Sequence, residues 1–237
     1  MYAQHLIFAS ELLNQTLPDG GPVYTETDLS RFIVEPWNAV SSLFIVVPAV
    51  IWLVRLRKKL ARFRFMMFCI PLMILGGMGS TFFHAFRASG IFLVMDVLPS
   101  AMLSLSLSIY FWLKVLRKWW YVIGIVVLFF VPRWLLWGNL PRATAINVSY
   151  GITGTVAALP IIIILFRNSF DQWVVATLTL MFFILALVFR EQDPYPNPLF
   201  PQGTHFLWHV FSGFGAFTIL AYIYRFRNRE LKEQALH

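Results

Sequence analysis

The feature that most constrains this chain is a succession of long apolar stretches, separated by short clusters of charged residues and prolines. A helix needs about 20 apolar residues to cross the hydrocarbon core of a bilayer, and roughly seven stretches approach that length. We therefore predict an all-α, polytopic membrane protein built as a seven-transmembrane-helix bundle. The expected spans are residues 36–54, 64–86, 91–113, 119–137, 144–166, 172–189 and 204–224.

These spans predict one membrane domain, residues 36–224, with a segment on either side. Residues 1–35 are expected to form an N-terminal extramembrane segment. Its opening has no basic start and carries Glu11 within an apolar stretch, which indicates a surface or interfacial segment rather than a signal peptide. Residues 225–237 are expected to form a basic cytoplasmic tail.

The basic residues predict how the chain is oriented in the membrane. A net charge of +8 could suggest nucleic acid, but the lysines and arginines lie in clusters between apolar stretches, so we expect no nucleic-acid partner. Alternate connections carry 14 and 5 basic residues, and the positive-inside rule then places the N-terminus outside and the C-terminus in the cytoplasm. The richer set is Arg55, Arg57, Lys58, Lys59, Arg62, Arg64, Lys114, Arg117, Lys118, Arg167, Arg225, Arg227, Arg229 and Lys232, and the poorer set is Arg31, Arg87, Arg133, Arg142 and Arg190.

Three histidines lie in or at the ends of the predicted spans, where ionisable groups are costly and therefore suggest a function. His205 and His209 are four residues apart, so both rings lie on one face of a helix, one turn apart. His84 ends the second span. This span runs outward and the seventh starts outside, so the three imidazoles are expected on the same side of the membrane.

Other polar residues are expected on this outer side. Asp96 lies one to two turns into the third span, where a carboxylate in an apolar stretch needs a partner. Ser80 shares a helix face with His84, and Glu35 precedes the first span. Taken alone, Ser80 is also explained as a small residue for helix packing, and Glu35 as an acid at a helix start.

Three imidazoles with one open coordination position are typical of a catalytic zinc site. We therefore predict zinc on His84, His205 and His209. Asp96 is the expected general base and general acid, taking a proton from the attacking water and returning one to the leaving group. Ser80 would hydrogen-bond the water or the developing oxyanion.

Four pieces of the sequence resemble the motifs of alkaline ceramidases. These enzymes belong to a superfamily of seven-helix hydrolases that also includes adiponectin-type receptors and GPI-remodelling phospholipase-like proteins. The SxxxH, D and HxxxH pattern is typical of the superfamily, and the EPWN and LWH stretches favour the ceramidase branch. The pieces are VEPWNAVSS (34–42), GMGSTFFHAF (77–86), MDVLP (95–99) and GTHFLWHVFSGFGAF (203–217).

The resemblance implies zinc on the three histidines, with Ser80 and Asp96 beside the attacking water. It also implies calcium at Glu35. The upstream segment GGPVYTETDLSRFIVE lacks the family's tryptophan pattern, which weakens the expectations of calcium and of ceramide specificity. The remaining candidate partners of Glu35 in a calcium site are Asp19, Glu26 and Asp28.

The predicted function is a zinc-dependent amidohydrolase of the membrane that cleaves a long-chain N-acyl lipid, ceramide first, to a fatty acid and an amine. Three alternatives stay open. The same site could hydrolyse a lipid ester, as a phospholipase does. The protein could be a receptor with structural zinc, or the histidines could bind haem, which would show a Soret band.

Overall fold

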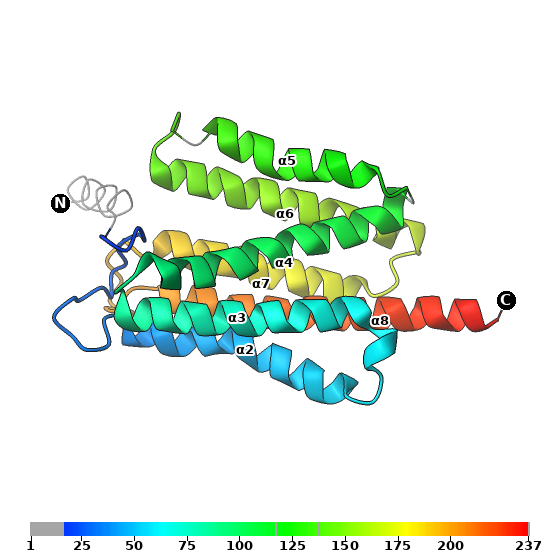
Figure 1. Ribbon diagram of the computed structural model, residues 1–237, viewed down its shortest axis with the longest axis horizontal. Coiled ribbons are helices and arrows are strands. Elements are labelled where there is room, and N and C mark those ends of the chain that lie inside the picture. The colour runs from blue at the N-terminus through cyan, green and yellow to red at the C-terminus, as the bar shows by residue number, and fades with distance from the viewer. Residues whose placement is uncertain (1–16, 117, 137, 237) are drawn as a thin grey trace.

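The computed structural model describes residues 17–116, 118–136 and 138–236, and in these ranges the chain is all-α (Figure 1). The predicted interfacial segment at residues 1–15 lies outside them. Seven α-helices and one 3₁₀ turn are present in the described ranges. They are α2 (Pro36–Leu56), η1 (Leu60–Arg62), α3 (Arg64–Phe86), α4 (Gly90–Leu116), α5 (Tyr121–Leu136), α6 (Arg142–Arg167), α7 (Trp173–Gln192) and α8 (His205–Ala235).

Six of these helices are long and apolar enough to cross a membrane, which confirms the prediction of a polytopic helical protein. The exception is α5, which is apolar but has 16 residues. At 1.5 Å per residue it is about 24 Å long, a few ångströms short of the hydrocarbon core. A seventh crossing therefore stays a prediction.

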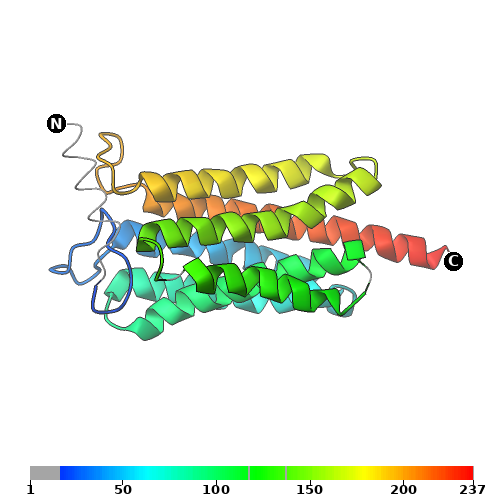
Figure 2. The ribbon, with the colours of Figure 1, turned by 90° about the horizontal axis from the view of Figure 1, so that it is seen from above.

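The helices run alternately in opposite directions and lie side by side (Figures 1 and 2). Helix α8 packs against both α2 and α7, while α3 packs against α2 and α4. Helix α6 packs against α4, and α5 covers both of these. As a result, the end of α3 and the beginnings of α2, α4 and α8 meet at one end of the bundle, and η1 and the end of α8 lie at the other (Figure 1).

The apolar core occupies the half of the bundle that contains η1. Trp52, Met66, Phe111 and Tyr222 are almost completely buried there, on four different helices. Many other large apolar side chains are exposed along the outer faces of the helices. A soluble monomer rarely exposes so much apolar surface, whereas a bilayer covers it.

In the stretch predicted to be a basic cytoplasmic tail, residues 225–235 are the last turns of α8, and its cytoplasmic position stays a prediction. Arg227 pairs with Glu230, and Arg229 pairs with Glu233, at the spacings that bring side chains together on one helix face. Lys114 of α4 also pairs with Glu230, at 2.5 Å. These pairs and the absence of Gly and Pro from this stretch explain why the helix continues.

Two glycines allow helices to approach closely where the polar residues lie. A Cβ atom at Gly213 of α8 would collide with the backbone of Phe44 in α2. A Cβ atom at Gly79 of α3 would collide with the backbone of Met95 in α4. These contacts bring α8 onto α2, and α3 onto α4, next to the predicted site.

We expect Gly213→Ala to lower the melting temperature of the purified protein, because the added methyl group must push α8 away from α2. Overpacking of this kind costs about 1–3 kcal/mol. Gly154→Ala in α6 is the matched control, because a Cβ atom there meets no other atom within 4 Å. It should leave stability unchanged or slightly raised; equal melting temperatures for the two variants would contradict the assigned contact.

Candidate metal centre

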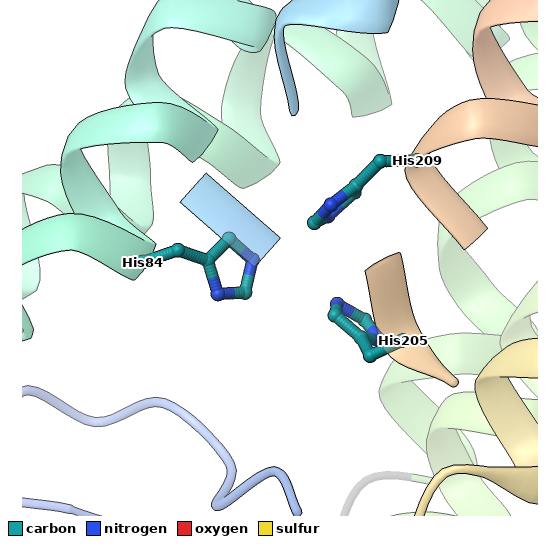
Figure 3. A group of neighbouring side chains, drawn as sticks. All are labelled: His84, His205 and His209. Atoms are coloured by element: carbon teal, nitrogen blue, oxygen red, sulfur yellow. The ribbon is translucent and has the colours of Figure 1, made fainter. Parts of the chain in front are cut away.

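Three histidines converge at the end of the bundle where α3 ends and α8 begins (Figure 3). One ligand atom from each of His84, His205 and His209 lies within 4.8 Å of the other two. All three side chains are buried. The rings of His205 and His209 lie with centroids 4.8 Å apart on successive turns of α8, and His84 faces them from α3. The three residues can hold one metal ion, as the sequence predicted.

The Glu35 carboxylate fixes the orientation of the His84 ring. Its Oε2 atom lies 2.5 Å from Nδ1 of His84, so Nδ1–H donates to the carboxylate. The other ring nitrogen, Nε2, is buried and has no hydrogen-bond partner in the described ranges. Backbone hydrogen bonds from Glu35 to His84 and from Val34 to Ala85 hold the two segments side by side. His84 therefore presents a free lone pair to a metal.

Two serines of α2 contact the His209 ring. Ser41 Oγ lies 2.9 Å from Nδ1 of His209, and Ser42 Oγ lies 3.3 Å from it. The Ser41 hydroxyl also donates to the Asn38 carbonyl, so its oxygen can accept the Nδ1–H of His209. In that tautomer Nε2 of His209 is left for a metal.

Asp193 holds the backbone of His205, and Tyr24 packs on its ring. Asp193 accepts hydrogen bonds from the backbone N–H groups of Thr204 and His205, at 2.9 and 2.8 Å, and so caps the beginning of α8. Burial raises the pKa of Asp193, and these N–H donors and that of Thr25 only partly oppose this effect. Tyr24 stacks on the His205 ring, with centroids 4.0 Å apart. Nδ1 of His205 is buried and lacks a partner in the described part of the chain.

The predicted catalytic pair, Ser80 and Asp96, also lies at this site. Ser80 is buried one turn before His84 in α3, and Asp96 is partly buried in α4. The Ser42 hydroxyl donates to Ser80 Oγ at 3.0 Å. The close approach of α3 and α4 at Gly79 places Ser80 and Asp96 near each other, because they directly follow Gly79 and Met95, the two residues that meet there.

Glu35, the predicted calcium ligand, is completely buried and has protein partners for both carboxylate oxygens. Besides His84, it accepts hydrogen bonds from Arg87 at 2.5 Å and from Thr27 at 2.6 Å. Burial by itself would raise the pKa of Glu35, but His84 and Arg87 outweigh burial and hold it below its ordinary value. The carboxylate is therefore ionised at neutral pH.

The three candidate calcium partners of Glu35 have other partners. Asp19 forms two hydrogen bonds with the Arg87 guanidinium. Glu26 accepts the backbone N–H groups of the first turn of α2 and caps that helix. Asp28 pairs with Arg31 near the surface. Calcium at Glu35 stays a prediction, and the structure provides protein donors for each of these carboxylates.

Some residues of the site were not singled out from the sequence. Ser41 and Ser42 lie in the quoted VEPWNAVSS stretch, three and four residues after Asn38, so helical spacing places the three side chains on one face of α2. This spacing could have predicted that the two serines belong to the site. Tyr24, Arg87 and Asp193 lie outside the helices, so helical periodicity provides no signal for them.

A comparison with protein-family models and with curated proteins finds no match to the chain. The resemblance to alkaline ceramidases therefore rests on the sequence motifs alone. The convergence of the three histidines rests on the geometry of the structure.

Proposed function

We propose that the protein is a zinc-dependent lipid hydrolase of the membrane, resembling the alkaline ceramidases, that cleaves the N-acyl amide of ceramide or of a related long-chain lipid. The observation that supports this proposal is the cluster of three buried imidazoles with an acid beside it. A structural polar cluster would pair its members with one another. Here a ring nitrogen of His84 and one of His205 have no partner in the described ranges.

The donor set favours zinc. Three neutral imidazole nitrogens with one open position are typical of catalytic zinc. The chain has one cysteine, Cys69, which is buried in the apolar core, so thiolate ligands from the same chain are absent. When bound, zinc would polarise the lipid carbonyl and lower the pKa of an attacking water to about 7.

The neighbouring residues would move the protons. Asp96 takes the proton of the attacking water and then donates it to the leaving nitrogen, so that the C–N bond breaks to give a fatty acid and a free amine. Ser80, which lies beside Asp96 where α3 and α4 approach each other, can orient this carboxylate or hydrogen-bond the developing oxyanion. Glu35 keeps His84 in the tautomer that the metal requires.

A lipid substrate fits the position of the site. The histidines lie inside a bundle of apolar helices whose outer faces are apolar as well. A long acyl chain could therefore reach the site from the bilayer between helices. The choice of an amide over an ester comes from the resemblance to ceramidases, since this chemistry serves either bond.

We further propose that the site faces the non-cytoplasmic side of a multi-pass membrane protein. The basic connection that contains Lys59 lies at the opposite end of the bundle (Figure 1), and the positive-inside rule places it in the cytoplasm. A cysteine introduced at Lys59 should be labelled by an impermeant reagent only after the membrane is permeabilised. Labelling in intact cells would reverse the proposed orientation.

Asp96→Asn provides the test of the catalytic assignment. We expect it to retain zinc and to lower the rate of hydrolysis of a fluorescent ceramide by about 10²–10⁴-fold, the usual contribution of a general acid and base. His209→Ala should lose both metal and activity. Zinc content by elemental analysis and turnover are measured on the same purified samples.

The outcome also separates the alternatives. A matched fluorescent ester that is cleaved while ceramide is not would replace the amidase by a lipid esterase. Wild-type protein that holds zinc and hydrolyses neither substrate would contradict the enzyme proposal and favour a receptor. An Asp96→Asn variant with full activity would remove Asp96 from the mechanism.

A further inference from the structure

Arg87 contacts the carboxylate that holds a histidine of the metal centre, although it does not contact the centre itself. It is the residue after the end of α3, and its backbone has a positive φ of 47°. In this conformation the guanidinium of Arg87 lies over the ring of Phe83, 4.4 Å from the ring centroid. A side chain at Gly21 would collide with the Phe83 ring and Arg87, so the loop leaves space for the guanidinium.

The guanidinium joins two buried carboxylates. Its Nε and Nη2 atoms bind Asp19 at 2.7 and 3.1 Å, while Nη1 binds Glu35 at 2.5 Å. The side chains of all three residues are fully buried. An unpaired buried charge is strongly unfavourable, so the two carboxylates depend on this one cation. Only arginine offers donors in a planar fork that suits two carboxylates at once.

The two oxygens of Glu35 have separate roles. Oε1 accepts Arg87 and Thr27, whereas Oε2 contacts Nδ1 of His84. Fixing Oε1 therefore fixes the direction in which Oε2 points, and with it the orientation of the His84 ring. Partners of this kind, beyond the ligands themselves, typically change metal affinity by about 10–100-fold.

We infer that Arg87 is a positioning residue for the metal centre, which holds Glu35 so that Glu35 orients His84. This inference rests on the metal site of the proposed function and not on turnover. The simpler view is that Arg87 only fastens the loop around Asp19. The two interpretations of Arg87 predict different dependence on Glu35. A positioning role must act through Glu35, whereas fastening the loop around Asp19 does not require it.

A double-mutant cycle on the full-length protein tests this route. The variants are Arg87→Gly, Glu35→Gln and both together. Glycine accepts the positive φ, so the backbone at residue 87 stays unstrained. Zinc affinity is measured by competition with a chelator, and the absorption spectrum of the cobalt-substituted protein reports the ligand geometry.

We expect Arg87→Gly to weaken zinc binding by about 10–100-fold and to change the cobalt spectrum. In the Glu35→Gln background the same substitution should change zinc affinity by less than about twofold, because the Glu35 carboxylate that links Arg87 to His84 is already absent. An equal loss in both backgrounds would overturn the inference, as would unchanged affinity and spectrum in Arg87→Gly.

Two further variants complete the design. Arg142→Gln is the matched control, because Arg142 donates to the carbonyl of Gly20 in the same loop but makes no contact with Glu35. It should retain wild-type affinity; a loss equal to that of Arg87→Gly would support the simpler view. Arg87→Lys keeps the charge without the fork and replaces Arg87→Gly in the cycle if that variant does not fold, with an intermediate loss expected.

The failures of the two proposals are distinguishable. Wild-type protein that binds neither zinc nor cobalt would overturn both. Protein that binds zinc and hydrolyses no lipid would overturn the proposed enzyme, while the cycle would still decide the role of Arg87.

Discussion

The hydrogen bond between the Glu35 carboxylate and Nδ1 of His84 determines which nitrogen of that ring can bind a metal. It joins the residue before α2 to the last turn of α3, and the backbone hydrogen bonds beside it keep the two segments in register. A buried carboxylate needs compensation, and Arg87 provides it. Asp19 in turn binds the guanidinium. The loop before α2 is therefore part of the candidate metal centre.

The acids of this region also complete the helices. The first N–H groups of a helix have no partner within it and need acceptors when they are buried. Glu26 accepts those of α2, and Asp193 accepts those of α8. Burial raises the pKa of Glu26, and its N–H donors only partly oppose that effect. Glu26 and Asp193 are thus engaged with helix N–H groups, whereas a ring nitrogen of His84 and one of His205 have no partner among the described residues.

Much of this arrangement could be predicted from the sequence, since it follows from local periodicity. The helical spacing of His205 and His209, and of Ser80 and His84, placed each pair on one face. The alternation of apolar spans then brought them to one end of the bundle. The spans 64–86 and 144–166 agree with α3 and α6 to within two residues.

Other features depend on contacts between distant residues. The apolar pattern ends near residue 224, but α8 continues because ion pairs and helix-forming residues extend it beyond the apolar region. The sequence analysis used Arg87 only as one of the basic residues in a connection. Its buried position in the structure depends on a backbone with positive φ, which the sequence pattern does not indicate. The stacking of Tyr24 on His205 requires the folded loop.

Zinc K-edge X-ray absorption on the purified wild-type protein would show whether the three imidazoles hold a catalytic zinc ion, as proposed. We expect three imidazole nitrogens and one oxygen around the metal, at about 2.0–2.1 Å, which is the shell of an open catalytic site. A shell of sulfur ligands, a shell with fewer than three imidazoles, or protein that retains no zinc would contradict it.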